Sequence, residues 1–176
     1  MSRVGVISRV FFLVTVMLFF TSCGYKPSAK YARVIVGEKI STSVIISAQD
    51  PENTVVIKDA VDAAVIEVFH ASLTTRSLST THLEISLNQP SYSPTQYDTY
   101  GYIIAYRTAI SLKIKRYKDG KMKLYTTRGT YDFTIVANAV ITDQERFNAI
   151  KFSSAKAIKA FITQVSAEGA RVKKEE

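Results

Sequence analysis

An alternation of apolar and polar residues in the middle of the chain constrains the fold more than any other feature. Nearly every second residue from 104 to 115 is apolar, which is typical of a strand with one buried face. The apolar set is Ile104, Tyr106, Ile110, Leu112 and Ile114, and the polar set is Arg107, Ser111, Lys113 and Lys115. Asp119-Gly120 then supplies the two residues that a type I′ hairpin turn favours. The pattern predicts antiparallel strands in a sheet with one buried face.

The strand that returns from this turn changes phase along its length. Met122 and Leu124 fit the alternation at its start, whereas Tyr131, Phe133 and Ile135 fall out of step after Gly129. An extra residue in one strand shifts the register in this way. We therefore expect a β-bulge near residues 128–129.

Two stretches have the 3.6-residue period of amphipathic helices. The first begins at Asp50-Pro51-Glu52, a helix-start signal, and should reach Leu73. Its apolar stripe is Ile57, Val61, Ala64, Val65, Val68 and Phe69. The second begins at a capping box, Thr142 to Glu145, and should reach Ala167. Its stripe is Phe147, Ile150, Ser154, Ala157, Ile158, Phe161, Ile162 and Val165.

The order of these elements predicts the fold class. A strand around residues 44–46 precedes the first helix, residues 83–87 alternate as a second strand, and residues 91–100 read as a loop. The order is strand, helix, three strands, helix. It predicts an α+β two-layer sandwich, with two helices packed on one face of a four-stranded, mostly antiparallel sheet.

The amino terminus has the organisation of a cleaved export signal. Arg3 and Arg9 precede an apolar run over residues 10–20 that is too short to span a bilayer. The next residues, Thr21-Ser22-Cys23-Gly24, resemble a bacterial lipobox. That resemblance implies cleavage before Cys23, which would then carry a diacylglyceryl group and an amide-linked acyl chain such as palmitate. The alternative is an ordinary secretory signal with an incidental cysteine.

These boundaries divide the chain into four parts. Residues 1–22 are the expected signal peptide, 23–31 a lipidated tether, 32–168 one α+β domain and 169–176 a charged tail. Gly24 after the cysteine matches the sorting pattern of many outer-membrane lipoproteins, so we expect anchoring at the periplasmic side of the outer membrane. Two acyl-type anchors hold a protein far more firmly than one.

The composition excludes several classes of function. With 47% hydrophobic and 22% charged residues the chain is too apolar to be disordered. One cysteine and two histidines leave no disulfide framework and little for a metal site. No catalytic constellation is recognisable, so we expect no enzyme activity, no catalytic residue, no metal and no cofactor beyond the lipid on Cys23. Export makes nucleic acid an improbable partner despite a net charge of +8.

The lipobox, the order of elements and the basic charge together resemble the LptE family of lipopolysaccharide-assembly lipoproteins. The segment 96–107, QYDTYGYIIAYR, and Tyr131-Asp132-Phe133 look like the form found in epsilonproteobacterial members. The resemblance implies a protein that plugs and helps assemble the outer-membrane β-barrel LptD, in the barrel lumen or at its periplasmic side, and that contacts lipopolysaccharide. The alternative, from another class, is a lipid-anchored scaffold of a secretion or surface-organelle complex.

Two residue sets are candidates for these contacts. Phosphates and carboxylates of lipopolysaccharide would suit the basic residues of the central strand pair. These are Arg107, Lys113, Lys115, Lys123 and Arg128. A lysine-rich strand face can equally serve only solubility. A partner interface would suit the tyrosines Tyr92, Tyr97, Tyr100 and Tyr102, whose rings combine large area with a polar tip. The alternative is a loop packed on its own domain.

Overall fold

The computed structural model describes residues 35–46, 51–69, 73–87, 89–137 and 139–175. The signal peptide, Cys23, the tether and the Asp50 helix cap lie outside the described residues. Side chains at both ends of the first helix, including Ile57 and Phe69, also lie outside them. Within the described ranges, no helix is long and apolar enough to cross a membrane.

The elements follow one another as a strand, a helix, four strands and a long helix. Their bounds are β1 Ile40–Ile46, α3 Pro51–Phe69, the 3₁₀ turn η2 Arg76–Leu78, β2 Thr81–Leu87, β3 Ser91–Tyr97, β4 Ile103–Lys118, β5 Lys121–Thr134 and α4 Asp143–Glu175. Asp119 and Gly120 both have positive φ, 50° and 70°, which confirms the predicted hairpin turn.

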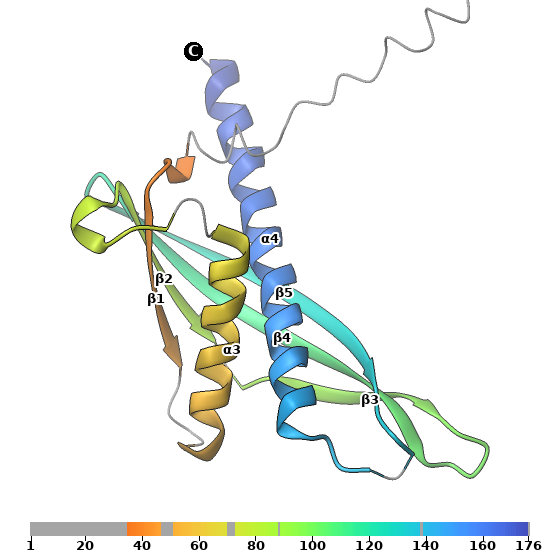
Figure 1. The fold of residues 1–176 in the computed structure, drawn as a ribbon. Helices are drawn as coiled ribbons and strands as arrows, with labels where there is room; N and C mark the ends of the chain where they lie inside the picture. The colour runs from red at the N-terminus through yellow and green to blue at the C-terminus, as the bar shows by residue number, and fades with distance from the viewer. Residues whose placement is uncertain (1–34, 47–50, 70–72, 88, 138, 176) are drawn as a thin grey trace, which may run out of the picture.

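The sheet is organised around β4, its longest strand. One edge of β4 pairs antiparallel with β5 along nearly its whole length. The other edge pairs with β2 over residues 112–117 and with β3 over residues 103–109, so β2 and β3 lie end to end (Figure 1). β1 joins β2 in parallel. The sheet is therefore four strands wide at one end and three strands wide at the other.

Both helices cover the same face of this sheet, and the core lies between the two layers (Figure 1). The predicted stripes meet there, with Val61, Ala64 and Val65 of α3 and Ile150, Ile158 and Phe161 of α4 buried. They pack on the apolar alternation of β2 and β4. The predicted α+β two-layer sandwich is confirmed, with five strands in place of four.

The additional strand is β3, within the segment that the sequence indicated as a loop. It is an exposed edge strand with register shifts after Pro94 and Gln96. A proline cannot donate a ladder hydrogen bond and is tolerated at a sheet edge, which is why a Ser- and Pro-containing strand lacks the usual pattern. The prediction of a loop over residues 91–100 was wrong for residues 91–97.

The predicted β-bulge near Gly129 is also wrong. The β4–β5 register continues without a shift, with Ile110 opposite Gly129 and Ser111 opposite Arg128. Met122 and Leu124 simply face outward, and both are exposed. The glycine serves a different purpose, since an added Cβ would lie 1.9 Å from the Ser153 carbonyl oxygen of α4. The missing side chain at Gly129 lets the backbone of α4 lie directly against β5.

The second helix begins as predicted and continues further than predicted. The Thr142 hydroxyl accepts a hydrogen bond from the Glu145 amide (3.2 Å), and the Glu145 carboxylate accepts one from the Thr142 amide (2.8 Å), which confirms the capping box. The helix extends to Glu175, so most of the expected tail 169–176 is helical. Basic residues near a helix carboxyl terminus stabilise its last turn.

Candidate functional site

The face of the sheet opposite the helices is the candidate functional surface, and we call it the open face. Strand register places one set of alternating side chains there, because the buried set points to the helices. From β2, β4 and β5 the charged members are Glu84, Arg107, Lys113, Lys115, Arg128 and Asp132. Four of the five predicted basic residues therefore share one face.

Two of these basic residues are neutralised by carboxylates on neighbouring strands. Arg107 donates two hydrogen bonds to Asp132, of 2.6 and 2.8 Å, in the planar fork geometry of a guanidinium. These bonds hold the pKa of Asp132 below its ordinary value. Lys115 donates to Glu84 over 2.6 Å, and this bond raises the pKa of Lys115. Neither cation is therefore available to a ligand without a competing partner.

The other two basic residues keep their charge on the open face. Lys113 lies between Ser86 and Thr126 in the register, and Arg128 lies opposite Ser111. Neither forms an ion pair with any described residue. The unneutralised positive charge of the predicted set on this face thus comes from Lys113 and Arg128.

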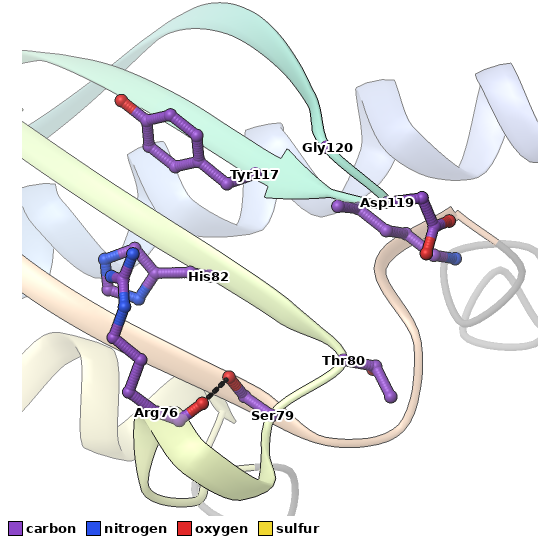
Figure 2. A pocket seen from close by; sticks show the side chains of 8 residues that line it. Arg76, Ser79, Thr80, His82, Tyr117, Asp119 and Gly120 are labelled. Atoms are coloured by element: carbon purple, nitrogen blue, oxygen red, sulfur yellow. Dashed lines mark hydrogen bonds between the residues drawn. The ribbon is translucent and has the colours of Figure 1, made fainter.

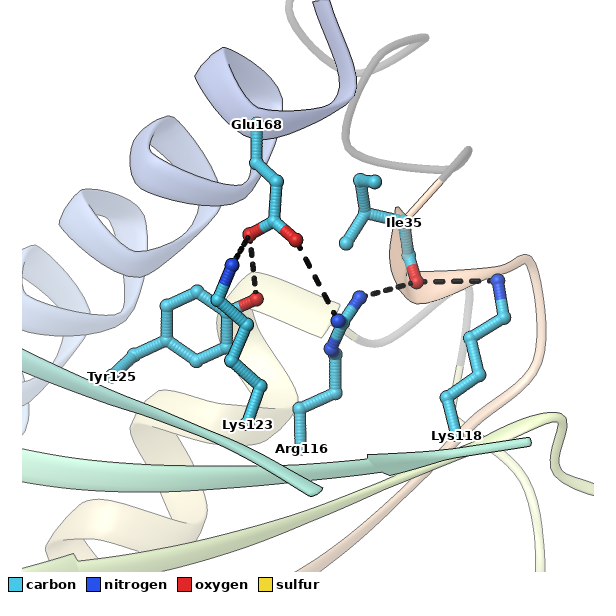
Figure 3. Close-up of polar contacts among 6 residues, drawn as sticks. All are labelled: Ile35, Arg116, Lys118, Lys123, Tyr125 and Glu168. Carbon is cyan, nitrogen blue, oxygen red and sulfur yellow. Dashed lines mark hydrogen bonds and ion pairs between the residues drawn. The ribbon is translucent and has the colours of Figure 1, made fainter. Parts of the chain in front are cut away.

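Lys123 does not belong to the open face. As an odd-numbered residue of β5 it points to the helix side, where its ammonium group lies 2.8 Å from the Glu168 carboxylate (Figure 3). Tyr125 donates a second hydrogen bond of 2.8 Å to the same oxygen. Lys123 and Arg128 are five residues apart, and an odd separation along a strand puts two side chains on opposite faces. Its role is therefore structural in this fold.

Glu168 joins this group to the point where the domain begins. Arg116 lies 3.7 Å from Glu168, and its guanidinium also donates to the Ile35 carbonyl oxygen over 2.9 Å. Lys118 donates to the same carbonyl over 3.2 Å. We call these residues, with Lys123 and Tyr125, the Glu168 cluster (Figure 3). It fixes the start of the described domain to β4, β5 and α4.

The charge of Glu168 is stabilised by this cluster. Burial opposes its ionisation, but hydrogen bonds from Lys123 and Tyr125 outweigh that effect and lower the pKa of Glu168. Burial and the bond to Glu168 raise the pKa of Tyr125. Sequence analysis identified only Lys123 of this cluster, because Glu168 lies more than 40 positions along the chain from the side chains that it contacts.

The four tyrosines separate into one inward and three outward side chains. Tyr92 points to the helix side, where burial raises its pKa to about 12. Its phenol oxygen has no hydrogen-bond partner within the described part of the chain. Tyr97, Tyr100 and Tyr102 are 59%, 84% and 47% exposed. Tyr97, Tyr100 and Tyr102 are therefore exposed and Tyr92 is not, and the partner interface at the three exposed tyrosines stays a prediction.

The exposed tyrosines lie on a structured hairpin between β3 and β4. The Asp98 carboxylate accepts hydrogen bonds from the backbone amides of Tyr100 (2.9 Å) and Tyr102 (2.8 Å). Figure 1 shows this hairpin at the end of the sheet farthest from Ile35 and the carboxyl terminus of α4. We call Tyr97, Tyr100 and Tyr102 the tyrosine hairpin. The fold thus presents these rings away from the end where the tether would join.

The open face and the tyrosine hairpin present charged and aromatic groups at the surface. No cluster of three or more histidine, cysteine, aspartate or glutamate side chains that could hold a metal occurs within the described ranges. The open face presents fixed charge, and the tyrosine hairpin presents aromatic area, which suit recognition of a charged or protein partner.

No known family model and no curated protein sequence matches the chain. The solved structures with a similar arrangement include several bacterial lipoproteins. A Caulobacter crescentus protein assigned as a lipoprotein has a TM-score of 0.49 and 10% identity, covering 81% of this chain and 94% of that one. Lipoprotein B of Nitrosomonas europaea has a TM-score of 0.43 and 14% identity, and the match covers 76% of this chain and 84% of that one. Rare lipoprotein B of Shewanella oneidensis has a TM-score of 0.37 and 9% identity, and the match covers 77% of this chain and 94% of that one.

Proposed function

We propose that this protein is an outer-membrane lipoprotein that plugs and helps assemble an LptD-like β-barrel, and so serves the delivery of lipopolysaccharide to the outer leaflet. The observation that supports this most is the separation of the two ends of the domain. The chain from Cys23 would join at the Glu168 cluster, while the tyrosine hairpin projects from the opposite end. A lipid anchor at one end and an aromatic surface at the other suit a domain that reaches into a partner.

The second part of the proposal is direct contact with lipopolysaccharide at Lys113 and Arg128. Both side chains lie on the open face, and neither has an ion-pair partner among the described residues. Phosphates would find uncompensated charge there, whereas Arg107 and Lys115 already hold carboxylates. This narrows the predicted basic set to two residues.

The barrel contact can be tested by photocrosslinking in native membranes. A benzoylphenylalanine residue at position 100 of the full-length protein should crosslink to an LptD-like barrel identified by mass spectrometry. The matched control is the same probe at position 159, an exposed position of α4. A crosslink from position 100 to a secretion or organelle subunit would favour the scaffold alternative, and equal barrel yield from both positions would contradict the proposed hairpin contact.

Lipid anchoring at Cys23 is tested separately. Cys23→Ala should abolish lipidation, because Cys23 is the only cysteine, and should leave unprocessed or mislocalised protein. Processing and outer-membrane fractionation unchanged from the wild type would contradict the anchoring.

Lipopolysaccharide contact can be tested on the purified lipidated protein. Lys113→Gln with Arg128→Gln should weaken lipopolysaccharide binding and flatten its salt dependence, because exposed charges are screened over about 8 Å at physiological ionic strength. Lys121→Gln with Lys159→Gln removes the same charge from other exposed sites. If the two double variants bind lipopolysaccharide with equal affinity and equal salt dependence, the charges of the open face serve solubility and not lipopolysaccharide binding.

A further inference from the structure

A pocket of about 300 Å³ lies at the end of the domain that holds Ile35, and the proposed function does not use it. It opens between η2, the start of β2 and the β4–β5 turn (Figure 2). Its lining residues are Arg76, Ser79, Thr80, His82, Tyr117, Lys118, Asp119 and Gly120. The lining thus contains two basic residues, one carboxylate and three hydroxyl groups.

A chain of hydrogen bonds fixes the proton on His82. The Ser79 hydroxyl donates to the Arg76 carbonyl oxygen (2.9 Å) and lies 2.8 Å from the Ser41 hydroxyl. A hydroxyl has one proton to give, so Ser41 donates to Ser79 and in turn accepts from His82 Nδ1 (2.9 Å). The other nitrogen, Nε2, then accepts from Ser43 (3.1 Å) when the ring is neutral.

The same chain tolerates a protonated ring. When Nε2 gains a proton, only its bond to Ser43 reverses, because the Ser43 oxygen can accept. Burial and the nearby Arg76 charge lower the pKa of His82, and the smaller effect of Glu84 opposes them. An anion beside Arg76 would remove part of this repulsion. The pocket can therefore increase its positive charge without losing a hydrogen bond.

Figure 2 shows the Arg76 side chain reaching toward the His82 ring, while Asp119 lies on the other side of the pocket. A guanidinium recognises tetrahedral oxyanions, since its planar fork matches two oxygens. Asp119 disfavours an anion at the turn itself, so an anion would bind at the Arg76 and His82 side. The geometry points to one phosphate group.

The position of the pocket indicates where that phosphate comes from. Lys118 lines the pocket and donates to Ile35, the first described residue of the domain. Ile35 follows Cys23 by twelve positions along the chain, and a chain of that length can span at most about 40 Å. We propose that the pocket formed by Arg76, Ser79 and His82 binds the phosphate of a phospholipid headgroup and orients the anchored end on the membrane. The lipid source, though not the phosphate chemistry, rests on the proposed anchoring.

The test uses the full lipidated protein in maltoside micelles, which contain no phosphate. The His82 ring resonances report on the pocket, and His70→Gln leaves His82 as the single histidine for assignment. Titration with inorganic phosphate at constant ionic strength, and separately with short-chain phosphatidylglycerol, should shift these resonances and raise the pKa of His82. Arg76→Gln should weaken both effects at least about tenfold.

The matched control is Lys121→Gln, which removes one charge beside the same turn without lining the pocket. It should leave both titrations near the wild type. Shifts with inorganic phosphate alone would overturn the headgroup assignment, and no saturable shift with either probe would overturn the pocket. Equal weakening by Arg76→Gln and Lys121→Gln would overturn it too, because net charge would then explain the binding. An unlipidated protein would contradict the anchoring, yet the inorganic phosphate titration would still test the pocket.

Discussion

The two ends of the domain are built differently. At the end that holds Ile35, the sheet is four strands wide, α4 extends over the Glu168 cluster, and charged groups bond to partners on other elements. At the end that holds the tyrosine hairpin, three strands continue, and aromatic side chains face solvent. Apart from the proposed phosphate pocket, the first end uses its charged groups and Tyr125 in contacts within the fold, whereas the tyrosine hairpin exposes its rings to solvent. Substitutions in the Glu168 cluster and the core should therefore change stability, and substitutions in the tyrosine hairpin should change binding.

The largest expected effect is on the packed end. Phe161 is fully buried, and its ring meets Tyr125 edge-on with centroids 5.1 Å apart. Phe161→Ala should lower the free energy of unfolding by about 3–5 kcal/mol, measured by denaturant titration. Phe152→Ala removes a partly exposed ring from the same helix and should cost less. Equal losses from the two variants would mean that burial does not distinguish them.

The next effect marks the boundary between the two ends. Gly129→Ala would place a methyl group against the Ser153 carbonyl oxygen, and backbone atoms cannot rotate away. We expect a loss of about 1–3 kcal/mol in unfolding free energy from the displacement of α4. Arg128→Ala, at the adjacent exposed position, is the control and should change stability little. A Gly129→Ala variant with unchanged stability would contradict the close approach.

A smaller and pH-dependent effect is expected from the Glu168 cluster. The pKa of Glu168 is lowered in the fold, so its carboxylate stabilises the protein above the ordinary pKa of 4.5, and this contribution is lost as the pH falls through the folded pKa. Glu168→Gln should cost about 1 kcal/mol at pH 7, because the site is partly exposed. The variant should also lose stability less steeply in acid than the wild type does. Identical acid profiles would contradict the cluster's role.

The smallest effect on stability is expected at the tyrosine hairpin. Tyr100 is 84% exposed, so Tyr100→Ser should change the free energy of unfolding by no more than about 0.5 kcal/mol. The same variant should reduce the amount of barrel that copurifies with the protein from native membranes. A large drop in melting temperature with unchanged copurification of the barrel would mean that Tyr100 serves the stability of the domain and not partner binding.

Much of the fold was predictable because the apolar periods of the strands and helices are local. The stripe of α4 and the alternation of β4 need only neighbouring residues to be recognised, and most residues of both sets are buried as expected. β3 was missed because an exposed edge strand needs no apolar alternation, and the Ser- and Pro-containing segment 91–97 has none. Gly129 was misinterpreted because its partner, Ser153, lies on another element.

The sequence predicted which basic residues share the open face better than it predicted the ion pairs that they form. Alternation alone put Arg107, Lys113 and Lys115 on one face. The sequence could not indicate that Asp132 and Glu84 would neutralise two of them, because those pairs depend on strand register. It also could not indicate that Glu168 would hold Lys123, since that contact depends on how far α4 continues.

The continuous β4 strand fixes the distance between the two ends of the domain. Sixteen residues at about 3.3 Å each set a distance of about 50 Å between its two ends. This length cannot shorten without breaking the ladder to β5. Removing two facing residues from each of β4 and β5 would move the hairpin inward by one repeat and keep every side chain on its face. Removing one from each would turn the outer part of the ribbon over, because each residue step exchanges the two faces. The distance from the Ile35 end to the tyrosine hairpin can therefore change only in steps of two residues per strand if every side chain is to keep its face.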